Sequence, residues 1–164
     1  MRDEIERALA PLVGLPLSAA DREADLLRLR FGAAGELALH VACPWRLRDA
    51  ERVLVGSGDL LTPADPEEEP ETFDWEAPGA SWLDVRLAEL QAADAARPPA
   101  VEAVEADVLG GVRLFITGGR LLELFPNATP TGHVSTEFWR LVRADGGEPD
   151  FAVGTFGAAR GADG

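Results

Sequence analysis

Residues 26–43 read LLRLRFGAAGELALHVAC, and their pattern indicates the architecture of the whole chain. In the first half, apolar residues alternate with arginine, so that one face carries Leu27, Leu29 and Phe31. After the turn-forming GAAGE, apolar residues alternate again, at Leu37, Leu39 and Val41. A period of two is typical of a half-buried strand, and glycine-containing segments between two such runs are typical of hairpins. The stretch therefore predicts an antiparallel β-hairpin.

Further strands follow the same logic along the chain. Apolar runs predict strands over 51–61, 101–109, 112–117, 120–125, 135–143 and 150–156. Gly-Gly pairs at 110–111 and 118–119 separate three of these runs, and such pairs favour tight hairpins because the preferred turns need positive φ. Strands grouped into hairpins argue against a doubly wound parallel sheet.

Two segments predict helices. SWLDVRLAELQAADAA (81–96) starts with Ser81 as an N-cap and Asp84 three residues later, which is the spacing of a capping box, and Leu83, Leu87 and Leu90 form its apolar stripe. RDEIERALA (2–10) predicts a short amphipathic helix that Pro11 stops. We therefore expect an α+β fold, with an antiparallel sheet of six to eight strands and one or two helices packed on it. The expected boundaries are a single domain over 1–157 and a loose tail over 158–164.

The composition narrows the cellular setting. The chain has 164 residues, 46% of them hydrophobic, which is enough for a real core, and no apolar run approaches the roughly 20 residues of a membrane span. Arginine takes every position that arginine or lysine could hold, because the chain contains no lysine, and tyrosine is also absent. Alanine, glycine and proline are abundant, as in proteins from high-G+C bacterial genomes. The acidic N-terminus is unlike a signal peptide and Cys43 is the single cysteine, so we expect a cytoplasmic protein without an internal disulfide.

The net charge of −14 is concentrated in the middle of the chain. Residues 61–110 contain 13 acidic residues and 2 arginines, a net charge of −11, and seven of the twelve residues 65–76 are acidic. Such a field repels nucleic acid and anionic membranes and favours a cationic partner. We expect residues 62–80 to form a mobile acidic loop that Phe73 and Trp75 attach to the body. A solvated loop that only increases solubility is the alternative interpretation.

His40 and Cys43 have the H-x-x-C spacing of a metal-binding pair, but residues three apart in a strand point to opposite faces. The sequence therefore predicts no metal site and no cofactor, and it predicts a core cysteine. Walker, G-x-G-x-x-G and G-x-S-x-G motifs are absent, so no catalytic residue is assigned and an enzyme is the less favoured class.

Two Trp-Arg dipeptides, Trp45-Arg46 and Trp139-Arg140, admit two interpretations. The first is a pair of core tryptophans beside arginines that form ion pairs on the surface. The second is an aromatic and cationic surface that binds a partner. A separate alternative function is a small-molecule-binding protein or enzyme with a pocket on the sheet, lined by His40, Trp45, Arg46, His133 and Arg140. A dimer joined through a sheet face or edge is a further hypothesis.

The order of LHVACPWRL, VLVGSGDLL, a helix, LLELFPN and EFWRLV resembles small proteins of high-G+C bacteria to which no activity is attached, over about residues 12–143. As a small acidic α+β domain the chain is also similar to the immunity proteins of bacterial toxin systems. That likeness implies a non-enzymatic module that binds a cationic protein partner. The residues expected to bind are Glu67, Glu68, Glu69 and Glu71 for charge, with Trp75 as an aromatic anchor.

Overall fold

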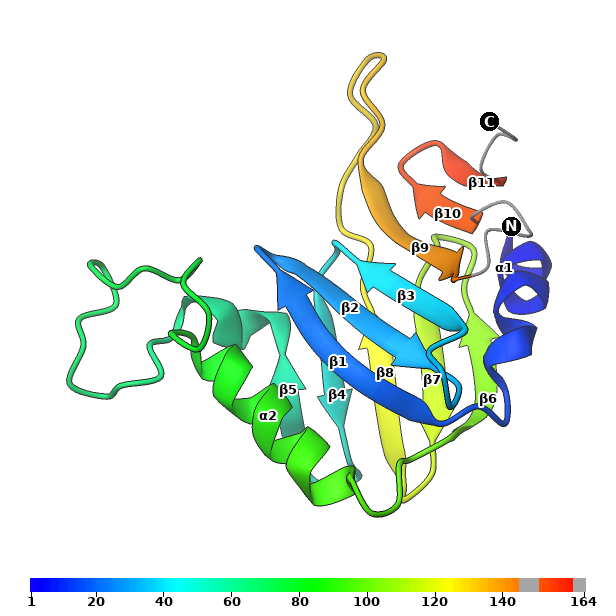
Figure 1. The fold of residues 1–164 in the computed structure, drawn as a ribbon. Coiled ribbons are helices and arrows are strands. Elements are labelled where there is room, and N and C mark those ends of the chain that lie inside the picture. Colours follow the sequence, from blue (N-terminus) through cyan, green and yellow to red (C-terminus); the bar gives the residue numbers. More distant parts are fainter. Residues whose placement is uncertain (145–150, 161–164) are drawn as a thin grey trace.

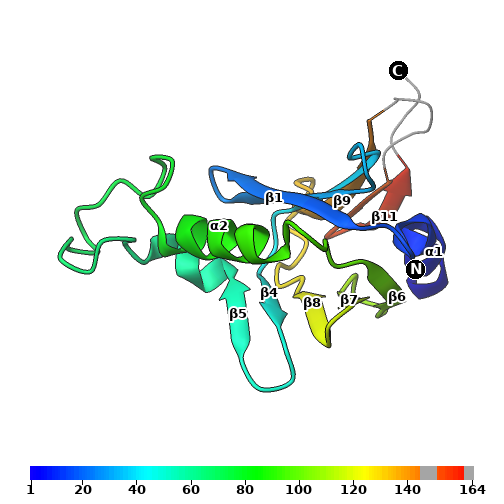
Figure 2. The same cartoon turned by 60° about the horizontal axis from the view of Figure 1, so that its bottom comes forward.

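The computed structural model describes residues 1–144 and 151–160 and contains two antiparallel sheets that pack face to face. Figures 1 and 2 show the two sheets, with helix α2 along one open side and helix α1 near the opposite side. The α+β class, the antiparallel pairing and the two helices are confirmed. The expectation of one sheet with six to eight strands is corrected, because the described residues form eleven strands in two sheets.

The first sheet has six strands in the order β1-β2-β3-β9-β10-β11. Their bounds are β1 (Leu17–Glu23), β2 (Leu26–Phe31), β3 (Leu37–Val41), β9 (Glu137–Arg143), β10 (Phe151–Gly154) and β11 (Gly157–Arg160). The predicted hairpin is β2–β3, in which Leu27 faces Val41, Leu29 faces Leu39 and Phe31 faces Leu37. All six of these side chains are buried, so the alternation in the sequence correctly gave the inward face.

The second sheet has five strands in the order β5-β4-β8-β7-β6. Their bounds are β4 (Trp45–Arg48), β5 (Val53–Gly56), β6 (Val101–Ala106), β7 (Val112–Ile116) and β8 (Arg120–Leu124). The predicted turn between β7 and β8 is confirmed, because Gly118 and Gly119 both have positive φ, at 82° and 72°. The chain passes from the first sheet to the second over residues 42–44, between β3 and β4.

Both predicted helices are present. Helix α1 (Arg2–Leu9) buries Ile5 and Leu9, and a 3₁₀ turn that includes Pro11 follows it. Helix α2 (Trp82–Asp94) begins after the buried Ser81, whose Oγ accepts a hydrogen bond from the Leu83 N–H at 3.1 Å. The Asp84 carboxylate accepts a hydrogen bond from the Ser81 N–H, which completes the predicted capping box.

Four segments differ from the expectation. Strand β4 was not predicted, and Ser57–Leu61 form a 3₁₀ helix, whereas the sequence predicts a strand over 51–61. Residues 158–160 belong to strand β11, which pairs with β10, whereas the sequence predicts a loose tail from residue 158; residues 161–164 lie outside the described part. Strand β1 was not predicted, because its sequence LSAADRE lacks a regular apolar alternation. Pairing with β2 along six residue pairs holds β1 in the sheet.

The described residues include no helix that is both long and apolar enough to cross a membrane. The core lies between the two sheets and contains Trp139, whose side chain is fully buried. The Trp139 indole N–H donates to the Gly110 carbonyl at 2.9 Å. This bond joins β9 of the first sheet to the turn between β6 and β7 of the second, and it satisfies the one polar atom of a buried tryptophan.

Candidate functional site

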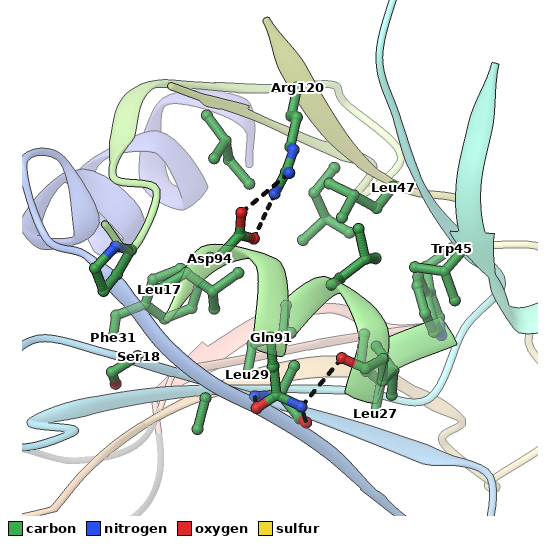
Figure 3. A pocket seen from close by; sticks show the side chains of 18 of the residues that line it. Leu17, Ser18, Leu27, Leu29, Phe31, Trp45, Leu47, Gln91, Asp94 and Arg120 are labelled. Carbon is green, nitrogen blue, oxygen red and sulfur yellow. Dashed lines mark hydrogen bonds and ion pairs between the residues drawn. The ribbon is translucent and has the colours of Figure 1, made fainter. Parts of the chain in front are cut away.

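A cavity of about 300 Å³ lies between the two sheets, on the side that α2 covers. Figure 3 shows that its walls come from both sheets and from the helix. Most of its wall is apolar, formed by Leu27, Leu29, Phe31, Trp45, Leu47, Val55, Leu87, Leu90, Ile116 and Leu122. A size near 300 Å³ and an apolar wall with few polar groups are typical of small-molecule sites.

The alternation of β2 and β4 builds two facing walls. Leu27, Leu29 and Phe31 point inward from β2, and Trp45 and Leu47 point inward from β4. The adjacent β1 contributes Leu17 at its start and then only small side chains, Ser18, Ala19 and Ala20. Because facing sheets stand about 10 Å apart, small residues on one wall leave space that large residues would fill. The cavity therefore follows from the same stretch of β1 that the sequence pattern did not identify as a strand.

Polar groups occur at the mouth of the cavity, along the last turns of α2. The Gln91 side chain accepts a hydrogen bond from the Ala20 N–H at 3.1 Å and donates to the Ala20 carbonyl at 2.8 Å. Its amide thus pairs with the outer edge of β1 as a neighbouring strand would, and it covers part of that edge. Gln91 holds α2 to the six-stranded sheet.

A second polar link holds α2 to the five-stranded sheet. The two terminal nitrogens of Arg120, on β8, donate to the two carboxylate oxygens of Asp94 at 2.5 and 3.1 Å. Each side chain keeps about a fifth of its surface exposed, so the pair lies at the boundary between cavity and solvent. Among the described residues that line the cavity, Arg120 is the only cation and Asp94 the only anion.

The other end of α2 is held by a more deeply buried ion pair. Arg22 on β1 donates through Nε and Nη2 to the two Asp84 oxygens, at 2.7 and 2.8 Å, and its side chain is 7% exposed. Hydrogen bonds from Arg22 hold the pKa of Asp84 below its ordinary value. Arg22 Nη2 also donates to the Trp75 carbonyl at 2.7 Å, so one arginine joins the acidic loop, α2 and the six-stranded sheet.

His40 and Cys43 do not converge: His40 lies on β3, whereas Cys43 lies in the connection after β3. Cys43 is buried in the core at 5% exposure, and burial raises the pKa of its thiol to about 11. A thiol in that state is a poor nucleophile and a poor metal ligand at neutral pH. His40 lies on the outer face, where it is the cross-strand neighbour of Arg28 on β2 and Arg140 on β9.

The Trp-Arg dipeptides conform to the interpretation of core tryptophans beside ion-paired arginines. Trp45 and Trp139 point inward and are buried, while the arginines that follow them point outward. Arg46 pairs with Glu123 at 2.6 Å and lies over the Phe125 ring at 5.2 Å, and Arg140 pairs with Glu137 at 2.8 Å.

The five-residue pocket expected from the sequence is corrected. Of its members only Trp45 lines the cavity. His40 and Arg140 are neighbours on the outer face of the first sheet, and Arg46 lies on the outer face of the second. His133 is exposed in the connection between β8 and β9. Alternation separates these residues, because each Trp-Arg pair sends its two side chains to opposite faces.

The acidic loop projects from the body beside the start of α2 (Figure 1). Glu67, Glu68, Glu69 and Glu71 are all exposed, and Phe73 is buried at 8% exposure, so Phe73 attaches the loop as expected. Trp75 is partly buried. The aromatic side chain that shares a surface depression with Glu67, Glu68 and Glu69 is Trp82, which is 37% exposed.

The sequence analysis did not identify three polar residues of the cavity, Gln91, Asp94 and Arg120, although each has a weak signal in the sequence. Gln91 is the only glutamine of the chain. Asp94 ends α2 with a negative charge, where the helix dipole favours a cation, so an external partner for it was to be expected. Arg120 follows the Gly-Gly turn at the start of β8.

No protein-family model, no curated protein and no solved structure matches this chain. Within residues 1–144 and 151–160, no group of three or more His, Cys, Asp or Glu side chains is arranged to hold a metal ion.

Proposed function

We propose that this protein is a non-enzymatic binding protein that takes an apolar small molecule into the cavity between its two sheets. The observation that carries the proposal is the 300 Å³ cavity, whose wall is mostly apolar and whose charged groups, Asp94 and Arg120, are paired with each other. Within the part of the chain that the structure describes, the cavity lining includes one carboxylate and one guanidinium, paired with each other, and neither histidine nor cysteine. That lining offers burial of apolar surface rather than acid–base or nucleophilic chemistry.

The volume limits the size of the ligand. If a methylene group needs about the volume of a water molecule, roughly 30 Å³, a cavity of about 300 Å³ accepts about ten such groups. Burying one methylene contributes about 0.8 kcal/mol, which corresponds to a roughly fourfold change in Kd. The proposal therefore expects a series of 1-alkanols to bind about fourfold more tightly per added carbon, up to about ten carbons, and then to stop improving.

Isothermal titration calorimetry with 1-hexanol to 1-dodecanol measures this series. Leu90→Trp, on the α2 side of the cavity, adds bulk to the wall and is expected to weaken 1-decanol binding at least tenfold. Ala92→Trp is the matched control, because Ala92 is exposed on the same helix and outside the cavity lining. No alkanol binding to the wild type, or equal binding by Leu90→Trp and wild type, would refute the proposal.

A second candidate function is the binding of a cationic protein by the acidic loop, as an immunity-like module would do. Its support is the exposure of Glu67, Glu68, Glu69 and Glu71, together with the depression in which Trp82 lies beside three of them. Carboxylates around an aromatic ring suit an arginine or lysine side chain of a partner. Trp75, the aromatic anchor expected from the sequence, offers a partner less surface than Trp82, because it is partly buried and its carbonyl accepts a hydrogen bond from Arg22.

The test of this candidate compares two variants of equal charge. One converts the four loop glutamates to glutamine; the other converts four exposed acids elsewhere to amides, at Asp25, Glu51, Glu89 and Glu102. The immobilised proteins are incubated with host-cell extract at low salt and then eluted with salt. A basic protein released in stoichiometric amount from wild type and control, but not from the loop variant, supports the candidate. Retention by the loop variant contradicts it.

The proposal assigns this protein to the bacterial cytoplasm, because a single cysteine is typical of reducing compartments. Neither candidate requires a metal, a cofactor or nucleic acid.

A further inference from the structure

The ion pair at the mouth of the cavity bears on which molecules can enter. We propose that Asp94 and Arg120 together select neutral apolar molecules, such as long-chain alcohols, and exclude the corresponding carboxylates and amines. This inference depends on the proposed small-molecule function and names its ligand class. Asp94 and Arg120 are specificity-determining residues in it.

The first step concerns the polar groups that a ligand could reach. Both hydrogens of the Gln91 amide have acceptors, since Nε2 donates to the Ala20 carbonyl at 2.8 Å and to the Leu87 carbonyl at 3.3 Å, and the amide oxygen accepts from the Ala20 N–H. Two uncharged polar groups also line the wall, the Ser18 hydroxyl, which donates to the Arg30 carbonyl at 3.1 Å, and the indole N–H of Trp45; the rest of the wall is apolar. The charged end of a ligand would therefore have to pair with Asp94 or Arg120.

A charged ligand can pair with Asp94 or Arg120 only by separating these two residues, which costs free energy. Arg120 is engaged by both oxygens of Asp94 in a bidentate pair, the strong geometry for these two groups. A ligand carboxylate must take Arg120 from Asp94, which leaves two carboxylates beside one guanidinium. A ligand ammonium must take Asp94 from Arg120, which leaves two cations beside one carboxylate. In both cases like charges repel at short range in a partly desolvated mouth. A neutral ligand leaves the pair intact.

Asp94 disfavours carboxylates and Arg120 disfavours ammonium groups, so the two residues reject opposite classes of ligand. Removing one member of the pair frees the other, so each single substitution admits one class of charged ligand and not the opposite class. Asp94→Asn frees the Arg120 guanidinium for a carboxylate. Arg120→Met frees the Asp94 carboxylate for an ammonium and keeps an apolar stem in the wall. Asp94→Asn also removes an unfavourable negative charge from the C-terminal end of α2, so the helix is expected to tolerate it.

The experiment measures three ligands of equal chain length, 1-decanol, decanoate and decylammonium, by isothermal titration calorimetry at neutral pH and below micelle-forming concentrations. Wild type is expected to bind 1-decanol at least tenfold more tightly than either ion. Asp94→Asn is expected to gain at least tenfold for decanoate alone, and Arg120→Met at least tenfold for decylammonium alone. Each gain is expressed relative to the binding of 1-decanol by the same variant, so that a general change in the cavity does not count as a change in selectivity. Circular dichroism and thermal unfolding confirm that each variant is folded.

Glu89→Gln is the matched control, because it removes one negative charge from an exposed position of the same helix outside the cavity lining. A gain for decanoate in Glu89→Gln as large as in Asp94→Asn would assign the effect to net charge and overturn the inference. Equal binding of 1-decanol and decanoate by wild type would overturn the inference and leave the proposed function standing. Failure of all three ligands to bind wild type and variants would overturn both.

Discussion

The ion pair between Arg22 and Asp84 is expected to stabilise the fold far more than any surface pair of the same chemistry. The Arg22 side chain is 7% exposed and that of Asp84 is 18% exposed, and the two make two hydrogen bonds of 2.7 and 2.8 Å. Arg22→Met removes these bonds and the bond to the Trp75 carbonyl, and it leaves a carboxylate partly buried without its cation. Removing one partner of a buried pair costs about 3 to 5 kcal/mol.

Because Asp84 keeps some contact with solvent and still accepts the Ser81 and Gly79 N–H groups, we expect the lower end of that range, about 3 kcal/mol. For a domain of this length that loss corresponds to a fall in Tm of roughly 6 to 12 °C. Urea unfolding followed by tryptophan fluorescence measures the free energy of unfolding, and calorimetry measures Tm.

Arg28→Met is the matched control. Arg28 lies on the neighbouring strand and pairs with Asp21 at 2.7 Å, but the two side chains are 28% and 43% exposed. An exposed pair contributes at most about 1 kcal/mol, so this variant is expected to lose no more than that. If Arg22→Met and Arg28→Met lower the free energy of unfolding equally, burial does not set the strength of these pairs and the reasoning is refuted.

Three further predictions concern pH, the thiol and the core. Since the hydrogen bonds of Arg22 lower the pKa of Asp84 in the folded state, this carboxylate stabilises the fold above its ordinary pKa of about 4, and the contribution is lost as the pH falls through the lower folded value. Acid unfolding curves of wild type and Arg22→Met should therefore converge below about pH 4; curves that stay parallel would contradict this. Burial and a pKa of about 11 should make Cys43 react with a thiol reagent only as the protein unfolds, so rapid labelling of the native state would be inconsistent with its position. Trp139→Phe should lower the free energy of unfolding by about 2 kcal/mol, because it leaves the Gly110 carbonyl without its donor and creates a small void; a loss below about 0.5 kcal/mol in urea unfolding would show that another group satisfies this carbonyl.

Local patterns predicted the elements whose chemistry is complete within a few residues. The β2–β3 hairpin followed from its alternation, α2 from the capping box of Ser81 and Asp84, and the β7–β8 turn from Gly118-Gly119. The outward position of His40 followed from strand geometry, and the burial of Cys43, which lies after the end of β3, followed from the low exposure typical of free cysteines. In each case neighbouring residues supply the hydrogen bonds, the positive φ or the alternation, so distant parts of the chain are not needed.

The division into two sheets and the cavity between them depend on contacts between residues far apart in the chain. Alternation gives each strand a buried face, but it does not say which strand lies opposite, so β3 and β4 pass into different sheets within a few residues of one another. Strand β1 is held by pairing with β2 rather than by its own pattern, and its alanines become a cavity wall only when α2 lies across the opening. Gln91 finds its partner 71 residues away, and Asp94 finds Arg120 at a separation of 26. The amino-acid sequence determines the faces and ends of the elements because those are local, whereas packing determines the site because its groups meet only in the folded chain.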